Sequence, residues 1–420
     1  MKWVVTFAGS RDHYQVPLAL AEAGRLEALV TDFYSPLNRP AWRSAPDWMR
    51  RRLARRYAEG LPSQLVQRTW SAVIANRLRG EHPGDHILGK YGGKQAREHG
   101  AALLSYSYYG FHAFRAFAGE RRPKVLFQVH PHPASVRRLL SEELEHGSGS
   151  KESLLAEHEL RLSKERYEQL AQESLMADYC IAASQYTRRT LLENGVSPDR
   201  VFVMPYGIDV EADSLPASRP SNLFRVLFVG QKIQRKGLSY LLEAWSRLKL
   251  PNAELVVAGR GNQDRELLRQ YAGTFRDLNN ASPADLDALY RQADLFCMPS
   301  LVEGFGLVYL EALARGLPIM GTVNTGAADL ITHGQEGFIV PVRDSEAIAQ
   351  HLDWSFRHRA TLRDMRVAAF ALAKQHSWQR FRHTCIQLIS RIEATWIEGD
   401  REMGRSSRRC CGRVAELGVC

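Results

Sequence analysis

Short apolar runs alternate with longer amphipathic stretches along nearly the whole chain. In the first half, six such runs predict buried strands, at residues 3–8, 28–31, 102–105, 125–129, 179–183 and 201–204. In the second half, five more runs predict strands, at residues 225–229, 254–258, 295–298, 318–322 and 338–340. Because strands that alternate with stretches of helical length form βαβ units, the pattern predicts an α/β fold with parallel sheets.

A stretch rich in proline and serine, residues 215–222, separates the two series of strands and has the composition of a linker. Two consecutive α/β halves joined near residues 206–222 predict two doubly wound, Rossmann-like domains that face a cleft. Ligands of such sheets bind beyond the carboxyl ends of the strands. We therefore expect the functional residues in the loops that follow the strands.

The composition of the 420-residue chain is ordinary for a folded protein. It is 45% hydrophobic and 24% charged, which excludes disorder over most of the chain. The apolar runs fall short of the ~18 residues that a membrane span requires, and six cysteines are too few for a disulfide scaffold. These features predict a cytoplasmic protein of two or three domains.

Charge is distributed unevenly along the chain, whose formal net charge is +10. Residues 39–138 hold 19 Lys and Arg against 6 Asp and Glu, a net of +13, whereas residues 139–178 hold 4 against 10, a net of −6. The second stretch is expected to be helical, with an interruption near residues 147–149. The basic excess therefore belongs to the first half of the chain.

The densest basic stretch, residues 47–57, has the pattern of an amphipathic helix. Met49, Leu53 and Tyr57 recur every four residues, and arginines occupy the other face. A basic amphipathic helix suits an anionic membrane surface. An ordinary surface helix, with its apolar stripe in the core, explains the same pattern equally well, so both interpretations stay open.

The most informative segment, residues 299–318, predicts a strand, a loop with two glycines and a helix. Gly304 and Gly306 permit close backbone approach because they lack a Cβ atom, and the amides at a helix N-terminus can hold a diphosphate. Glu303 lies in this loop and Glu311 within the helix. We assign both carboxylates to sugar hydroxyls, because a carboxylate beside a phosphate is otherwise unfavourable.

The spacing of Glu303 and Glu311 resembles the Glu-x7-Glu pattern of retaining, nucleotide-sugar-dependent glycosyltransferases of the GT-B fold, in particular the "glycosyl transferases group 1" (family 4) type. Four flanking segments are similar to those of that family as well: residues 293–300, 337–344, 206–209 and 377–378. The resemblance covers residues 180–395 well and the first 140 residues loosely.

The resemblance implies a division of labour between the two halves. It predicts an acceptor-side domain over residues 1–205, with a basic helical insertion at about 36–90, and a nucleotide-sugar donor domain over 206–380. A helix over 381–400 is expected to return to the first domain. Residues 401–420, which are basic and rich in cysteine, are expected to form a disordered tail.

Several donor-binding residues follow from the resemblance. Lys236 matches the family's phosphate-binding lysine, but Gln231 stands where the family has arginine, so Lys232 or Arg235 is expected to supply the second cation. Cations aimed at a leaving diphosphate stabilise the transition state. The full donor-binding set is Gly9, Gly230, Gln231, Lys232, Arg235, Gly259, Gly261, Gly304, Phe305, Gly306, Leu307 and Glu311.

Three residues are the catalytic candidates: His130, Glu303 and Lys236. His130 follows the strand at 125–129, at a position where the family has a histidine near the donor sugar, and His132 is the spare candidate. A neutral imidazole there would bind a sugar hydroxyl and orient the acceptor. Asp285 and Asp287 match an Asp-x-Asp metal signature of another fold, but they lie in a helical run and are rejected as a metal site.

These inferences predict a retaining, metal-independent hexosyltransferase that needs no cofactor. Its co-substrate would be a UDP- or GDP-sugar and its acceptor a glycan, a lipid-linked molecule or a small molecule, in glycan or polysaccharide biosynthesis. Residues 47–57 would give peripheral contact with the inner membrane face, and no nucleic acid is expected. The alternatives are a catalytically silent GT-B partner subunit and, from another class, a nucleic-acid-binding protein that uses residues 39–138.

Overall fold

The computed structural model describes residues 1–35, 46–78, 83–147, 151–210, 215, 222–261 and 264–416. It contains two compact units. The first comprises Met1–Leu126, Met176–Cys180 and Arg382–Cys420, and the second comprises Phe127–Leu175 and Ile181–Phe381. Parts of the predicted insertion, most of the predicted linker and the last four residues of the predicted tail lie outside the described residues. The domain boundary expected at residues 205 and 206 stays a prediction.

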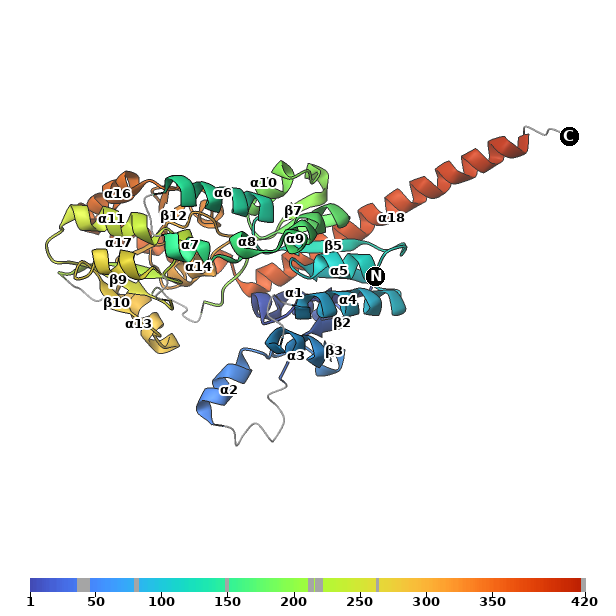
Figure 1. Ribbon diagram of the computed structural model, residues 1–420, viewed down its shortest axis with the longest axis horizontal. Coiled ribbons are helices and arrows are strands. Elements are labelled where there is room, and N and C mark those ends of the chain that lie inside the picture. The colour runs from blue at the N-terminus through green and yellow to red at the C-terminus, as the bar shows by residue number, and fades with distance from the viewer. Residues whose placement is uncertain are drawn as a thin grey trace. The chain divides into compact units, whose positions relative to one another are not determined.

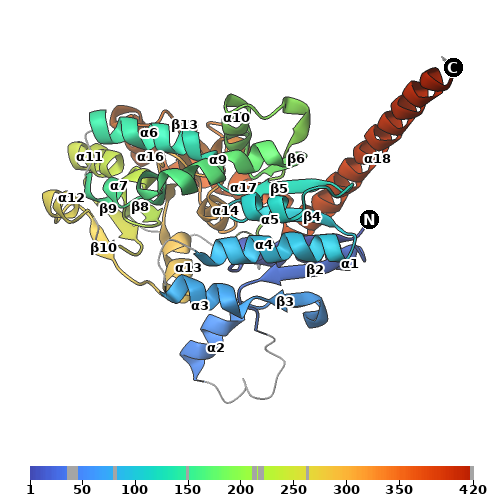
Figure 2. The same ribbon diagram turned by 45° about the vertical axis from the view of Figure 1, so that its right-hand side comes forward.

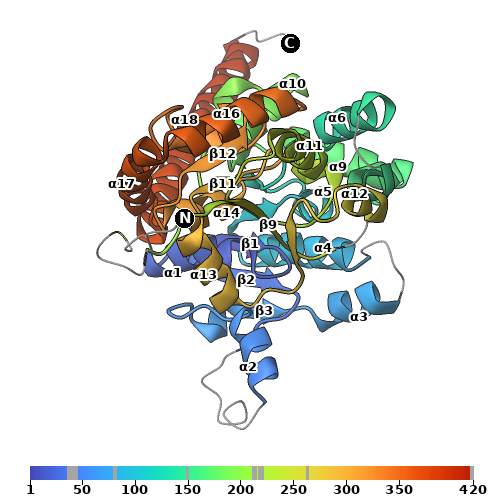
Figure 3. The same cartoon turned by 90° about the vertical axis from the view of Figure 1, so that its left-hand side faces the viewer.

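The strands form two sheets. The first has the order β3-β2-β1-β4-β5-β6-β7, and the second has the order β10-β9-β8-β11-β12-β13. β1 pairs in parallel with β2 and β4, and every neighbouring pair of the second sheet is parallel. Figure 3 shows β1, β2 and β3 side by side in that sheet. The predicted α/β fold with two Rossmann-like parallel sheets is confirmed.

All eleven predicted strands are present, with ends that move by at most two residues. Those of the first sheet are β1 (Trp3–Thr6), β2 (Leu26–Thr31), β3 (Val66–Arg68), β4 (Ala102–Tyr106), β5 (Lys124–Gln128), β6 (Tyr179–Ala182) and β7 (Val201–Val203). Those of the second sheet are β8 (Phe224–Val229), β9 (Ala253–Ala258), β10 (Arg276–Leu278), β11 (Leu295–Cys297), β12 (Ile319–Thr322) and β13 (Gly337–Val340). The pattern missed β3 and β10 because no residue of these three-residue edge strands is buried.

The helices of the first unit begin with the 3-10 turn η1 (Arg11–Tyr14). They continue with α1 (Gln15–Glu22), α2 (Asp47–Ala54), η3 (Ser63–Leu65), α3 (Trp70–Leu78), α4 (Pro83–Glu98) and α5 (Gly110–Ala116). α4 and α5 lie side by side, as Figure 2 shows. Gly89 makes this possible, because a Cβ at that position would overlap the carbonyl oxygen of Tyr109.

The last helix, α18 (Trp378–Glu416), is the long red helix of Figure 1. Within the first unit, Arg382 Nη1 of this helix donates to Gln15 Oε1 of α1 at 2.8 Å, and its Nε donates to Glu22 Oε2 at 3.0 Å. The predicted return of the C-terminal helix to the first domain is therefore confirmed. The helix continues past residue 400, into the segment for which a disordered tail was expected.

The helices of the second unit pack around the second sheet and the end of the first. They are α6 (Pro133–His146), α7 (Lys151–Leu155), α8 (His158–Arg161), α9 (Lys164–Met176), α10 (Gln185–Glu193), η4 (Pro198–Arg200), η5 (Gln234–Lys236), α11 (Leu238–Leu248), α12 (Arg265–Gln270), α13 (Pro283–Gln292), α14 (Leu307–Leu313), α15 (Ala327–Leu330), α16 (Ser345–Arg357) and α17 (Arg359–Gln375). α11 and α16 pack against each other (Figures 1 and 3). The acidic stretch 139–178 thus belongs to four helices, with short breaks between them.

Candidate active site

The turn after β8 carries two adjacent cations, Arg235 and Lys236, in η5. Close approach of this turn to its neighbours is possible because Gly259, which follows β9, and Gly237, which ends the turn, lack a Cβ atom. A Cβ at Gly259 would overlap the carbonyl oxygen of Gly230, and one at Gly237 would overlap that of Pro299. Gly237 also has a left-handed backbone, with φ of 71°, which favours glycine. The sequence therefore places the two cations beside the loop that follows β11.

Glu303 lies in that loop and forms ion pairs with both cations. Lys236 Nζ donates to Glu303 Oε2, and Arg235 Nη1 lies 3.4 Å from the same oxygen. Arg235 Nε also donates to both carboxylate oxygens of Glu157, at 3.1 and 3.2 Å. The side chains of Lys236 and Glu303 are each only 13% exposed, so water screens these charges weakly.

The protonation states follow from this arrangement. Burial alone would raise the pKa of Glu303, but Lys236 and Arg235 lower it to about 2. Burial lowers the pKa of Lys236, against the opposing effect of Glu303. Burial also raises the pKa of Glu157, and Arg235 opposes that shift. Glu303 is consequently a carboxylate at neutral pH, and its two cations are already partly neutralised.

His130 lies against the same loop. A Cβ at Gly304 would overlap the carbonyl oxygen of Val129 and lie 3.1 Å from His130 Cα, so the end of β5 and the Glu303 loop are in direct contact. Thr187 Oγ1 fixes the contact by donating to the Gly304 carbonyl at 3.1 Å. His130 also contributes to the lowered pKa of Glu303, less than Lys236 and Arg235 do.

His132, the spare candidate, has a structural role instead. It is the N-cap of α6, where its Nδ1 accepts from the Ala134 amide at 3.2 Å, and its Nε2 lies 3.2 Å from the Ala171 carbonyl oxygen. Burial lowers the pKa of this histidine. Its ring is therefore committed to holding α6 in place.

Lys232 and Gln231 have different surroundings from Arg235. The buried Lys232 Nζ donates to Asp277 and, at 2.8 Å, to Asn279 Oδ1, at the end of β10. Gln231 is exposed. The Lys232 amide donates to the Arg260 carbonyl at 3.1 Å, so Lys232 lies with the predicted Gly259–Gly261 loop. Between the two candidates for the second cation, Arg235 is the one in contact with Glu303.

The remaining residues of the Glu-x7-Glu segment lie on and before α14. Gly306, its N-cap, is left-handed with φ of 89°. Phe305 is buried and packs edge-on against the Tyr206 ring, with centroids 5.4 Å apart. Glu311 Oε2 accepts from the Tyr290 hydroxyl at 3.0 Å. Glu311 therefore has partners different from those of Glu303, and Leu307 begins the helix between them.

The Asp-x-Asp match of α13 is explained by helix capping and ion pairs. Asp285 forms a capping box with Ser282, whose amide donates to it at 2.9 Å. Asp287 accepts from Arg291 Nε at 2.6 Å and from Arg315 Nε at 2.8 Å. In the part of the chain that the structure describes, His, Cys, Asp and Glu form no group of three suited to a metal ion.

The first unit has its own loop after β1, which contains the predicted Gly9. Gly9 is left-handed, with φ of 88°, and its amide donates to Asp32 Oδ1 at 2.9 Å. The same loop holds Asp12, a buried carboxyl that accepts from the Tyr106 hydroxyl and that sequence reasoning missed. Burial raises the pKa of Asp12 to about 7.

Sequence reasoning also missed Glu157, the second carboxylate on Arg235. The only sequence feature that pointed toward Glu157 was the acidic composition of residues 139–178. That composition indicates a charged stretch but does not indicate which glutamate is buried. Both missed groups are acidic residues distant in sequence from their partners. The roles of all the predicted site residues stay predictions, because the structure shows where they lie and not what they bind.

Two sequence profiles match the chain. The family described as "Glycosyl transferases group 1" matches residues 211–371, and "Glycosyltransferase Family 4" matches residues 79–212. Together they span residues 79–371 without a gap.

Curated relatives are similar over part of the chain. A phosphatidyl-myo-inositol mannosyltransferase of Mycolicibacterium smegmatis is 34% identical over 181 residues, which cover 41% of this chain and 46% of the relative. A D-inositol 3-phosphate glycosyltransferase of Pseudarthrobacter chlorophenolicus is 31% identical over 206 residues, covering 44% and 49%. The chain thus spans about half the length of these relatives.

Among solved structures, HepE of Anabaena in complex with UDP-glucose has a TM-score of 0.61 with 16% sequence identity, over 93% of this chain and 99% of that one. At this identity the likeness shows the fold alone. The two profile matches show that the chain belongs to the group 1, or family 4, glycosyltransferases, and this likeness and the two parallel sheets show the GT-B fold.

Proposed function

We propose that this chain is a retaining glycosyltransferase that moves a hexose from a UDP- or GDP-sugar to a glycan, lipid-linked or small-molecule acceptor. The observation that carries the proposal is the cluster of Lys236, Arg235, Glu303 and His130, which lie in the loops after β8, β11 and β5. The family membership supports it, and so does the presence of UDP-glucose in the solved HepE complex.

Each residue of the cluster has a role in this proposal. Lys236 and Arg235 would stabilise negative charge on the leaving diphosphate, since cations in a poorly screened site act strongly on developing charge. Amides from Gly304 to Leu307 would bind the diphosphate, and Glu303 would bind hydroxyls of the donor sugar. Glu311 would bind the ribose hydroxyls. His130 would form a hydrogen bond with a sugar hydroxyl, either as donor or as acceptor.

Retention follows if bond breaking and bond forming occur on the same face of the sugar. The bond between sugar C1 and the diphosphate oxygen breaks, and a bond from C1 to the acceptor oxygen forms. The acceptor proton passes to the leaving phosphate oxygen. The protein's part is to stabilise the charge that develops on the diphosphate and to orient both substrates.

The relatives' names favour a phosphorylated or lipid-linked acceptor. One is named for a phosphatidyl-inositol acceptor and another for an inositol phosphate. Both acceptors carry phosphate, which agrees with the net positive charge of residues 39–138. Glycan or polysaccharide biosynthesis is the pathway class that we propose.

The test is a thermal-shift screen of the full chain with UDP-, GDP- and ADP-sugars, followed by assays of nucleoside diphosphate release. A ligand that binds the native state raises the melting temperature. Lys236→Met should lower turnover by about 10²–10³-fold, the size expected when one charge-stabilising group is lost. Lys164→Met is the matched control, because Lys164 is an exposed lysine on α9.

Each other result has a distinct meaning. Binding of a nucleotide sugar without turnover by any acceptor would favour the silent partner subunit. No binding of any nucleotide sugar, together with salt-sensitive RNA binding, would favour the nucleic-acid-binding protein. Equal turnover by Lys236→Met and the wild type would contradict the assignment of Lys236.

We also propose peripheral contact with an anionic membrane through the first unit. In α2 and just after it, Arg50 and Arg55 are exposed, whereas Arg56 pairs with Asp32 at 3.0 Å. On α3, Trp70 and Ile74 are 52% and 55% exposed, and their four-residue spacing puts them on one face. Exposed tryptophan and arginine together suit the headgroup region of a bilayer.

Vesicle sedimentation tests the membrane proposal. Arg50→Gln with Arg55→Gln, and separately Trp70→Ala with Ile74→Ala, should weaken binding to vesicles that contain phosphatidylglycerol while leaving donor binding unchanged. Arg56 is left intact because its ion pair holds the loop at Gly9. Equal sedimentation of both variants and the wild type would show that this surface is an ordinary solvent-exposed face that does not bind the membrane. Among the described residues, every helix is too short or too polar to span a bilayer.

A further inference from the structure

The turn that carries Arg235 and Lys236 is held by residues from the acidic stretch, about 80 to 90 positions earlier in the sequence. The Gln234 amide donates to Ser153 Oγ at 2.8 Å, and Gln234 Nε2 donates to Glu143 Oε1 at 2.7 Å. Glu157 accepts from Arg235. Two of the three residues of η5 are therefore bound by α6, α7 and the residue that precedes α8.

This attachment does not depend on Glu157. Ser153 is itself fixed, because its amide donates to the buried Asp264 Oδ1 at 2.9 Å. Glu143 is fully buried and also accepts from Tyr240 at 2.9 Å and from Arg343 Nε at 2.7 Å. These bonds anchor α6 and α7 whether or not residue 157 is charged.

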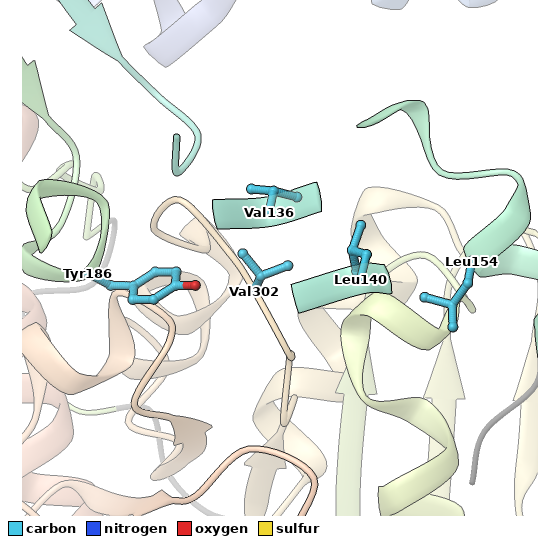
Figure 4. Packing of buried hydrophobic residues seen from close by; sticks show 5 residues of the cluster. All are labelled: Val136, Leu140, Leu154, Tyr186 and Val302. Carbon is cyan, nitrogen blue, oxygen red and sulfur yellow. The ribbon is translucent and has the colours of Figure 1, made fainter. Parts of the chain in front are cut away.

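Apolar packing anchors the same segment a second time. Figure 4 shows Val302 among Val136 and Leu140 of α6 and Tyr186 of α10, with Leu154 of α7 beyond Leu140 in the same cluster. Val302 directly precedes Glu303, so this cluster sets the position of the Glu303 loop. Glu157 therefore contributes charge to the site, while other groups determine the fold around it.

The charges near η5 cancel in pairs. Arg235 and Lys236 are opposed by Glu303 and Glu157, so the four side chains have no net charge when ionised. Glu303 has an assigned role toward the donor sugar, whereas Glu157 has none. A nucleoside diphosphate brings negative charge to this cluster, and Glu157 repels it.

We propose that Glu157 is a counter-charge that occupies Arg235 while the site is empty and limits how tightly the site retains a nucleoside diphosphate. This inference rests on the proposed function. Glu157 acts through Arg235 and is a positioning residue. Its effect is to favour release of the product, because the carboxylate competes with the diphosphate for the same guanidinium.

Calorimetric titration of the full chain with UDP and with GDP tests the proposal. Glu157→Gln keeps an acceptor for Arg235 Nε but removes the charge. Its affinity for the nucleoside diphosphate that the wild type binds should rise about tenfold at low ionic strength, as expected for one poorly screened charge. The gain should shrink as salt is added. Glu152→Gln is the matched control, because Glu152 is an exposed glutamate on α7, and its affinity should match that of the wild type since its charge is screened.

Two further variants separate charge from structure. Ser153→Ala weakens the anchor without a change of charge, so it should lower the melting temperature and leave the affinity near that of the wild type. Glu157→Asp keeps the charge but withdraws it from Arg235, and its affinity should rise by about twofold because the ion pair lengthens. If Glu157→Gln does not fold, this aspartate variant alone decides the question.

Equal or weaker diphosphate binding by a folded Glu157→Gln variant would overturn the proposal, because a merely structural residue would produce that result. Failure of the wild type to bind either nucleotide would instead overturn the proposed function. The two failures are therefore distinguishable in a single set of titrations.

Discussion

The loops after β1 and β8 have the same local design and different chemistry. Each loop follows the strand that comes first in the sequence among those of its sheet, and each leads into a helix, α1 or α11. The residue before the helix has almost the same backbone in both: Tyr14 has φ of 63° and ψ of 21°, and Gly237 has φ of 71° and ψ of 21°. One loop meets this geometry with glycine and the other with a buried tyrosine.

The comparison shows where strain and charge are placed. In the loop after β1, three consecutive residues, Asp12, His13 and Tyr14, are left-handed, at about 1–2 kcal/mol each. That loop also contains the carboxyl of Asp12, whose pKa burial raises to about 7. In the loop after β8, the left-handed position is glycine and the buried charges are paired. The second loop thus pairs its buried charges on a glycine turn, and the first stores strain.

The largest effect is expected at Gly237. Gly237→Ala should lower the free energy of unfolding by about 3–5 kcal/mol, because the new Cβ would overlap the Pro299 carbonyl oxygen and the backbone is left-handed. Chemical denaturation measures this. Gly273→Ala is the control, since Gly273 has φ of 82° but no neighbour within 4 Å. If both variants lose the same stability, the close approach to Pro299 is unimportant.

The next effect concerns Asp12. Its pKa is raised in the folded state, so its contribution to stability is fully present below the unfolded pKa of about 4 and is lost as pH rises through about 7. Asp12→Asn does not titrate. At pH 8 it should therefore be more stable than the wild type by about 2–4 kcal/mol. The free energy of unfolding is measured at pH 4 and pH 8. An equal change between the two pH values in the wild type and in Asp12→Asn would contradict this prediction.

Glu303 should show the opposite pH dependence. Its pKa of about 2 is below the usual value, so its stabilisation is present above pH 4.5 and is lost as pH falls toward 2. The wild type should lose up to about 3 kcal/mol over that interval through this group. Glu303→Gln should lack this part of the acid transition. An identical acid transition in both proteins would show that Lys236 and Arg235 do not stabilise the carboxylate.

The difference between the loops also explains what could be predicted from the sequence. Local patterns identified eleven of the strands and the glycine turns, because each depends on neighbouring residues, whereas Lys236 was singled out by the family resemblance. Arg235, by contrast, pairs with Glu157, a buried glutamate 78 positions earlier in the sequence. Nothing in the neighbouring residues distinguishes Glu157 from the exposed Glu152. Phe305 illustrates the converse case, since a residue inside a predicted binding motif has its ring buried against Tyr206.

Asp12 could not be predicted for a related reason. Its burial depends on Tyr106, at the end of a strand 94 positions later. Its left-handed backbone is held by the packing of Tyr14, whose ring contacts Phe7 and Tyr34. Tertiary contacts thus override the preference for glycine at such positions.

The smallest effect is expected at His13, which tests whether the strain in the first loop is real. His13 is left-handed, with φ of 51°, and exposed, so glycine would remove the steric cost without a loss of core packing. Because glycine also increases the entropy of the unfolded chain, His13→Gly should raise the free energy of unfolding by only about 0.5 kcal/mol. His13→Ala, which keeps the Cβ, should show no gain. Denaturant midpoints of the two variants decide the question. If glycine is no more stabilising than alanine, the left-handed backbone at this position is not strained. The loops after β1 and β8 would then differ in charge and not in strain.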